Sequence, residues 1–140
     1  MELKDLALLS NGSLHGVSLE ASEFSIDTRS IKKGEVYIAI EGQNFDGHDF
    51  IKDAENKGAS AFIVSREVIS NLPFVVVNNT LDFMETIAVH NRSSFNGNMI
   101  GITGTNGKTT SKQILSSLLS QIHKTHKTDG NKNNHIGVPF

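Results

Sequence analysis

The sequence predicts an α/β protein made of a small N-terminal α/β unit and the start of a second unit built on a parallel sheet. Two observations lead to this prediction. Short apolar runs typical of strands alternate along the chain with segments whose apolar residues recur at helical spacing. In addition, the apolar residues 99–102 lead into a glycine-rich turn and then into another amphipathic segment. We place the boundary between residues 79 and 80, so that the two units span 1–79 and 80–140.

The first unit is expected to alternate strands and helices that polar turns connect. Its expected elements are, in chain order, a helix at 3–9, an extended segment at 24–29, a strand at 35–40, a loop at 41–47, a helix at 49–57 and strands at 61–64 and 73–77. The turn Ser10-Asn11-Gly12 and Gly58 are expected to end the two helices, because glycine and asparagine tolerate the backbone that follows a helix.

The second unit is expected to begin with a helix that Thr80 caps, since a threonine hydroxyl can accept a hydrogen bond from the N–H groups of the first turn. The inward face of this helix is expected to carry Leu81, Met84, Ile87 and Ala88.

Further along, residues 99–102 are expected to form a buried strand, and residues 111–122 a helix with one apolar face. That face would carry Ile114, Leu115, Leu118, Leu119 and Ile122. A parallel sheet needs several strands with helices on both faces, and residues 80–140 hold material for only about two such strands. We therefore expect the second unit to be incomplete and the chain to be a fragment of a longer protein.

Residues 101–110, Gly-Ile-Thr-Gly-Thr-Asn-Gly-Lys-Thr-Thr, lie between this strand and helix. A glycine loop with a lysine in that position is the arrangement that holds a nucleotide triphosphate, because its backbone N–H groups and the helix N-terminus attract phosphate oxygens. Lys108 is expected to reach the β- and γ-phosphates of ATP, and the Thr109 hydroxyl to ligate Mg²⁺, which makes them the candidate catalytic residues. The expected ATP-binding residues are Gly104, Thr105, Asn106, Gly107, Lys108, Thr109 and Thr110.

The spacing of this loop departs by one place from the general phosphate-loop pattern, in which a glycine stands five residues before the second glycine. That position holds Ile102 here. The alternative interpretation is a glycine-rich turn with an incidental lysine, but the flanking strand and helix favour the phosphate loop.

Composition narrows the function classes further. The formal net charge is −2, and the 13 lysines and arginines are dispersed, so neither nucleic acid nor an acidic membrane is an expected partner. No apolar run approaches the roughly 20 residues of a membrane span, and the first residues do not form a signal peptide. Cysteine is absent, which fits a reducing compartment. We expect a cytoplasmic protein that is a monomer and does not insert into a membrane.

With these stretches in place, the chain resembles the Mur ligase family. Four segments carry the resemblance, at residues 25–29, 34–50, 101–110 and 130–139. The resemblance implies a first domain that binds the UDP part of a sugar nucleotide, a central ATP-binding domain that begins near residue 80, and a third domain that is absent here.

Within the family, the segments Asn44-Phe45-Asp46-Gly47-His48 and 130–139 are most similar to the ligases that join D-alanyl-D-alanine to a UDP-N-acetylmuramoyl-tripeptide. The resemblance implies ATP-dependent ligation through an acyl phosphate, with ATP and Mg²⁺ as cofactors. The same resemblance implies UDP-sugar contacts at Ile26, Thr28, Arg29, Gln43, Asn44, Phe45, Asn133 and Asn134.

Other interpretations of these residues stay open. Asp27 and Thr28 can simply shape a turn, Phe45 can belong to a core, and the asparagines near the C-terminus can form an ordinary loop. The histidines, including His48 and His90, are interpreted as surface or helix-end residues, and no zinc site is expected. His135 stands where family members often carry an acid.

Three function classes therefore compete. The first is the D-alanyl-D-alanine ligase, and its nearest alternative is a family member that adds an amino acid to a UDP-N-acetylmuramoyl-dipeptide. The second is a different phosphate-loop NTPase, such as a kinase. The third is a UDP-sugar-binding module whose phosphate loop is not catalytic.

Overall fold

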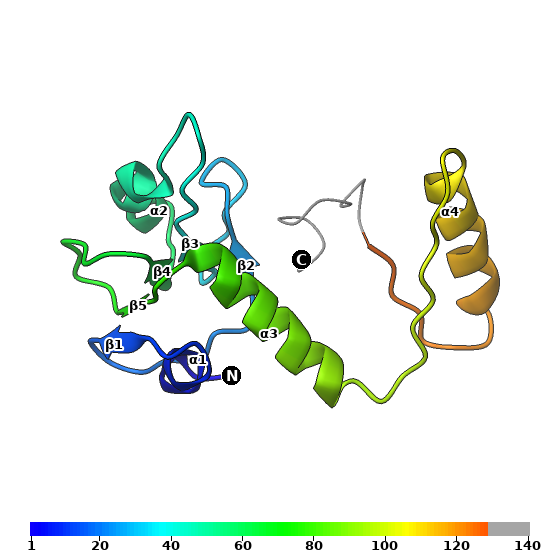
Figure 1. Cartoon of the computed structure of the whole chain (residues 1–140), viewed down its shortest axis with the longest axis horizontal. Coiled ribbons are helices and arrows are strands. Elements are labelled where there is room, and N and C mark those ends of the chain that lie inside the picture. Colours follow the sequence, from blue (N-terminus) through cyan, green and yellow to red (C-terminus); the bar gives the residue numbers. More distant parts are fainter. Residues whose placement is uncertain (129–140) are drawn as a thin grey trace. The chain divides into compact units, whose positions relative to one another are not determined.

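The computed structural model describes residues 1–128, and Figure 1 shows the course of the chain. The chain forms two compact units, Met1–Val89 and His90–Phe140, which are described one at a time below. The division falls within helix α3 (Thr80–Ser94). We predicted a domain boundary just before this helix, at residues 79 and 80, and that boundary remains a prediction.

A five-stranded sheet forms the centre of the first unit. Its strands are β1 (Ser13–His15), β2 (Phe24–Ser25), β3 (Val36–Ile38), β4 (Ala61–Val64) and β5 (Phe74–Val76). Their spatial order is β1-β5-β4-β3-β2. Strands β2 to β5 run parallel, and β1 pairs antiparallel with β5 at one edge. The α/β fold class is therefore confirmed for this unit.

The central strands lie where the sequence predicts them, with shorter bounds. The segment predicted as extended at 24–29 is a strand only over Phe24–Ser25, because Asp27 to Ser30 form a turn in which the Ser30 N–H donates to the Asp27 carbonyl at 3.2 Å. Strand β1 was not predicted, since three residues with Gly12 before them and Gly16 after them carry too little pattern.

Helices cover both faces of the sheet, with α2 on one face and α1 and α3 on the other (Figure 1). The helices of this unit are α1 (Leu3–Leu9), the 3₁₀ turn η1 (Gly47–Phe50), α2 (Ile51–Asn56) and α3 (Thr80–Ser94). The helices predicted at 3–9 and 49–57 are confirmed, the second one beginning with the 3₁₀ turn.

Alternation along the strands assigns the buried side chains to the two faces. Tyr37, Phe62, Val64 and Phe74 form one cluster with Ile51 and Ala54 of α2. The intervening Ile63 and Val75 are fully buried and face the other way. The Phe24 and Phe83 rings meet edge-on with centroids 6.4 Å apart, which joins β2 to α3. Each fully buried side chain of this size contributes about 1.5–3 kcal/mol to stability.

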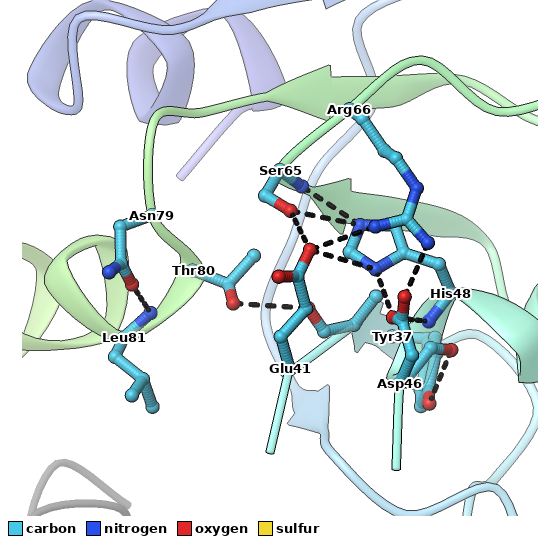
Figure 2. Close-up of polar contacts among 11 residues, drawn as sticks. Tyr37, Glu41, Asp46, His48, Ser65, Arg66, Asn79, Thr80 and Leu81 are labelled. Carbon is cyan, nitrogen blue, oxygen red and sulfur yellow. Dashed lines mark hydrogen bonds and ion pairs between the residues drawn. The ribbon is translucent and has the colours of Figure 1, made fainter. Parts of the chain in front are cut away.

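The N-cap of α3 is Asn79, so the prediction of Thr80 is wrong. The Asn79 side-chain oxygen accepts hydrogen bonds from the N–H groups of Leu81 at 2.7 Å and Asp82 at 3.3 Å. The Thr80 hydroxyl instead donates to the carbonyl of Ala39 at 3.0 Å, so it is buried and already bonded (Figure 2). This bond attaches the start of α3 to the end of β3.

In the second unit, residues 99–102 form no strand, and the prediction of a buried strand there is wrong for the part of the chain that the structure describes. Met99 and Ile100 are 64% and 57% exposed. A strand is stabilised by hydrogen bonds to a neighbouring strand, and residues 90–128 contain none.

The helix after the glycine loop is confirmed as α4 (Lys108–Leu119), which begins three residues before the predicted start at residue 111. The apolar face predicted for it is present but exposed, with Ile114 and Leu118 both more than half accessible. Ile122, predicted for the same face, lies beyond the end of the helix. Every helix within residues 1–128 is too short or too polar for a membrane span.

Candidate functional site

The carboxyl ends of the parallel strands bring several polar segments to one edge of the sheet. Strands β2 to β5 run in the same direction, so the residues that follow them all emerge at that edge. In open α/β sheets this edge is where ligands bind. The segments in question are 26–30 after β2, 39–46 after β3, 65–66 after β4 and 77–79 after β5. Of the eight sequence-predicted UDP contacts, six lie here, at Ile26, Thr28, Arg29, Gln43, Asn44 and Phe45.

The first of these segments, residues 26–30, is a turn that a residue at the C-terminal end of α2 holds in place by a hydrogen bond. Thr28 is buried, and its carbonyl accepts a hydrogen bond from the Lys57 ammonium at 2.9 Å. The same ammonium pairs with Asp53 at 3.0 Å. Hydrogen bonds from Lys57 and from the Thr28 side chain lower the pKa of Asp53. Lys57 and Asp53 therefore fix the position of Thr28 in this turn, and its predicted contact with UDP remains a prediction.

Arg29 is exposed and already has an anionic partner. Its guanidinium donates to both carboxylate oxygens of Asp27, with Nη2 to Oδ2 at 2.6 Å and Nε to Oδ1 at 2.9 Å. Hydrogen bonds from the Arg29 side chain and backbone lower the pKa of Asp27 to about 2. A diphosphate would bind Arg29 either together with Asp27 or by displacing Asp27 from the guanidinium.

The loop after β3 presents Gln43, Asn44 and Phe45 to solvent. Phe45 is 57% exposed, so the interpretation of this ring as a core residue is wrong. The Gly42 N–H donates to the Phe45 carbonyl at 2.9 Å, and Glu41 pairs with Asp46 in an isolated antiparallel bridge. The loop is thus a small closed hairpin with an exposed aromatic face and two amides.

A network of polar side chains lies at the base of this loop (Figure 2). His48 is buried, and its Nδ1 lies 2.6 Å from Asp46 Oδ1. The Ser65 N–H donates to His48 Nε2 at 3.0 Å. Arg66 donates to Glu41 at 2.9 Å and also to Asp46. Burial acts to raise the pKa of Asp46, but hydrogen bonds from Arg66 and from the backbone and ring of His48 outweigh it and lower the pKa.

Sequence reasoning missed this network. His48 does lie at the start of a helical segment, as expected for a helix-end residue, but it is buried and not on the surface. The available signal was Asp46, which stands two residues before His48 and caps η1 by accepting its N–H at 2.9 Å. Ser65 and Arg66 are far away in sequence, so only the fold brings them to His48.

Three ligand atoms of this network, from Glu41, Asp46 and His48, lie within 4.8 Å of one another, which is close enough to surround a metal ion. Arg66 already supplies positive charge to both carboxylates. His48 Nε2 is used as an acceptor by Ser65. The arrangement is therefore an ion-pair and hydrogen-bond network within the protein.

The second unit carries the glycine loop, whose backbone has the positive φ values that favour glycine. Gly104 has φ +149° and Gly107, the N-cap of α4, has φ +77°. The Ser111 N–H donates to the Gly107 carbonyl at 2.8 Å, which is the first bond of the helix. The N–H groups of Lys108, Thr109 and Thr110 come before it in the helix and have no partner within the helix. They are the donors that an anion at a helix N-terminus meets.

Lys108 folds back over this loop, where its ammonium donates to the Gly104 carbonyl at 2.6 Å. The ammonium thus lies close to the backbone of the glycine loop. The donors available for a phosphate group are the backbone N–H groups, the Lys108 ammonium and the hydroxyls of Thr109 and Thr110. This donor set fits a triphosphate, and a threonine hydroxyl fits a magnesium ion as a hard oxygen ligand. The predicted contacts Asn133 and Asn134, together with His135, lie outside the described residues.

The order of these two units matches a known family along most of the chain. The Mur ligase family, catalytic domain, matches residues 20–94, and the Mur ligase middle domain matches residues 102–140. The chain therefore belongs to the Mur ligase family.

Similar proteins within this family include two kinds of ligase. One is the UDP-N-acetylmuramoyl-L-alanyl-D-glutamate–2,6-diaminopimelate ligase of Aquifex aeolicus, which is 40% identical over 97 residues, a match that covers 68% of this chain and 20% of that protein. The chain is 38% identical over 140 residues to the UDP-N-acetylmuramoyl-tripeptide–D-alanyl-D-alanine ligase of Buchnera aphidicola, a match that covers 100% of this chain and 31% of that protein. The chain spans about a third of the length of the relatives that it matches.

Solved structures agree with this assignment. The UDP-N-acetylmuramoylalanyl-D-glutamyl-2,6-diaminopimelate–D-alanyl-D-alanyl ligase from Acinetobacter baumannii matches with a TM-score of 0.85 at 28% identity, over 97% of this chain and 31% of that one. The MurF ligase from Thermotoga maritima, solved in complex with ADP, matches with a TM-score of 0.71 at 35% identity, over 85% of this chain and 28% of that one.

Proposed function

We propose that the full-length protein is an ATP-dependent ligase that joins D-alanyl-D-alanine to a UDP-N-acetylmuramoyl-tripeptide in the synthesis of peptidoglycan precursors. The observation that carries the proposal is the glycine loop with Lys108 folded over it, in a chain that matches ligases of this name from end to end. We further propose that the protein works as a monomer in the cytoplasm, where ATP is available.

The second unit would bind the nucleotide. ATP, when bound, supplies the γ-phosphoryl group that converts the substrate carboxylate into an acyl phosphate. Phosphoryl transfer depends mainly on positioning and on neutralising charge. Lys108 would exchange the Gly104 carbonyl for phosphate oxygens, and the backbone N–H groups of residues 104–110 would bind the same oxygens. Thr109 would hold Mg²⁺ through its hydroxyl, and Thr110 would add a donor.

The first unit would bind the UDP moiety at the carboxyl edge of its sheet. Asn44 and Gln43 carry amides that can recognise the donors and acceptors of uracil. The exposed Phe45 ring can stack on the base. Ile26, Thr28 and Arg29 on the turn after β2 would complete this site, with Thr28 or Arg29 approaching the diphosphate. Asn133 and Asn134 remain proposed contacts on the strength of the resemblance alone.

The test is ATP-dependent phosphate release by the full-length protein. We expect release only when both UDP-N-acetylmuramoyl-tripeptide and D-alanyl-D-alanine are present. The Lys108→Ala variant should lose turnover by a factor on the order of 10²–10³, the range seen when one transition-state donor is removed, and should keep the circular dichroism of the parent. The exposed Lys124→Ala in the same unit is the matched control. Equal turnover of the Lys108 and Lys124 variants would contradict the role of Lys108.

The same assay separates the alternatives. A family member that extends the dipeptide would release phosphate with UDP-N-acetylmuramoyl-dipeptide and a free amino acid. A binding module would bind UDP without releasing phosphate under either condition. A different phosphate-loop NTPase would release phosphate without the UDP-sugar.

A further inference from the structure

The hairpin that carries Gln43, Asn44 and Phe45 is held at both ends by the side chains of two residues that follow another strand. Glu41 and Asp46 flank the hairpin and face each other in a bridge. Ser65 and Arg66 follow β4, the strand next to β3. Both flanking carboxylates therefore accept hydrogen bonds from residues that the neighbouring strand positions (Figure 2).

His48 is the centre of this attachment, and its hydrogen bonds determine its tautomer. The Ser65 backbone N–H can only donate, so His48 Nε2, at 3.0 Å, is the acceptor. In the neutral ring the proton then lies on Nδ1, which donates to Asp46 Oδ1 at 2.6 Å. The Ser65 hydroxyl donates to Glu41 Oε1 at 2.7 Å. One buried imidazole thus connects the far end of the hairpin to the backbone after β4.

Arg66 provides a second attachment on the solvent side. Its Nη1 donates to Glu41 Oε1 at 2.9 Å and its Nη2 donates to Asp46 Oδ2. The pair is half-exposed, so its contribution to stability is small. Its geometric effect is still specific, because one planar guanidinium fixes the separation of the two carboxylates at the base of the hairpin.

We propose that His48 and Arg66 are positioning residues that hold the 42–45 hairpin in the conformation that receives the UDP moiety. The inference rests on the proposed function, since that function assigns the ligand. A loop that is ordered before binding loses less conformational entropy when the ligand arrives. Removal of the attachment should therefore weaken UDP binding without any loss of a direct ligand contact.

Two amide substitutions separate the effects of the two hydrogen bonds of the imidazole, because each variant keeps one bond and loses the other. In His48→Asn the amide nitrogen lies near the place of Nδ1 and can still donate to Asp46. In His48→Gln the amide oxygen lies near the place of Nε2 and can still accept from Ser65. His48→Phe removes both bonds and keeps an aromatic ring at this position, although the phenyl ring is somewhat larger than the imidazole. His90→Phe, in α3, is the matched control, because none of the hydrogen bonds of this network involves His90.

The experiment measures the full-length protein in three ways. Calorimetry gives the affinity for UDP, steady-state kinetics gives separate KM values for the UDP-sugar and for ATP, and hydrogen exchange reports the amides of residues 41–46. Loss of one neutral hydrogen bond corresponds to about a fivefold change in an equilibrium constant. We expect His48→Asn, which loses the neutral bond from the Ser65 N–H, to weaken UDP binding by about fivefold. His48→Gln, which loses the bond to the Asp46 carboxylate, should weaken it by more, and His48→Phe by the most, with the KM for ATP unchanged. Exchange at 41–46 should rise in the same order.

The outcomes discriminate between this proposal and the proposed function. If the parent protein does not bind UDP, the proposed function is overturned. The assignment of UDP as the ligand of the hairpin is then overturned as well. If the parent binds UDP and all His48 variants bind equally well, only the positioning role is overturned. A fall in kcat with an unchanged KM for the UDP-sugar would also contradict it. Should His48→Phe fail to fold, the asparagine and glutamine variants and Arg66→Gln carry the same test.

Discussion

Replacement of Gly47 by alanine tests how closely η1 must approach the end of β3. A Cβ at this position would lie 2.6 Å from the Ile40 nitrogen and 2.9 Å from both Ala39 Cα and the Ile40 oxygen. These atoms are all backbone, so no side-chain rotation can relieve the contact. Gly47 also donates its N–H to the Ile40 carbonyl at 2.8 Å and accepts the Tyr37 hydroxyl at 3.1 Å.

The expected cost combines these effects. Overpacking of a filled region costs about 1–3 kcal/mol, and disturbing a buried hydrogen bond adds about 1 kcal/mol. We therefore expect Gly47→Ala to lower the free energy of opening of the first unit by about 2–4 kcal/mol. Gly34→Ala is the control, because Gly34 has φ +93° with no heavy atom near its Cβ position. Backbone strain alone should cost it about 1 kcal/mol.

The assay is native-state hydrogen exchange of the β3 and β4 amides in the full-length protein. Because each amide is read individually, it gives the free energy of opening of the first unit separately from the stability of the other domains. The reasoning is refuted if Gly47→Ala leaves that free energy within about 0.5 kcal/mol of the parent, the range of an inconsequential surface substitution. An effect no larger than that of Gly34→Ala would also refute the claim of a steric contact.

Three further predictions concern stability, measured by denaturant unfolding at the stated pH. Asn79→Ala should destabilise the start of α3 by about 1 kcal/mol because it removes the N-cap, whereas the exposed Asn78→Ala should not, and equal effects would contradict the cap. Burial raises the pKa of Tyr37 to about 12, so the native state keeps a proton that the unfolded chain releases near pH 10. Stability should therefore fall as the pH rises from about 10 to about 12, and a slope retained in Tyr37→Phe would exclude this cause. Because Arg29 lowers the pKa of Asp27 to about 2, the advantage of the parent over Arg29→Gln should be full above pH 4 and shrink as the pH falls toward 2; an advantage that does not depend on pH would contradict the pairing.

The elements that the sequence predicts correctly are those whose pattern is local. The apolar spacing of residues 3–9 and the β-rich runs at 35–40 and 61–64 each contain enough residues to define a period. The glycine loop was also predictable as a loop before a helix, since Gly104 and Gly107 adopt backbone conformations that favour glycine.

The errors arise where a distant partner decides the outcome. Asn79 and Thr80 are both good N-cap residues, and the Ala39 carbonyl, 41 residues from Thr80, takes the threonine hydroxyl and leaves the cap to Asn79. Residues 99–102 have the composition of a strand, but a strand also requires a neighbouring one. His48 gave no signal of burial because Ser65, which donates to its ring, lies 17 residues away.

The most direct test of the central claim is a crystal structure of the full-length protein with a non-hydrolysable ATP analogue and Mg²⁺. The account predicts that Lys108 Nζ leaves the Gly104 carbonyl and lies within hydrogen-bonding distance of the β- and γ-phosphates, with the backbone N–H groups of residues 104–110 around them. A structure in which the phosphates bind elsewhere while Lys108 remains on Gly104, 2.6 Å from its carbonyl as it is here, would contradict it.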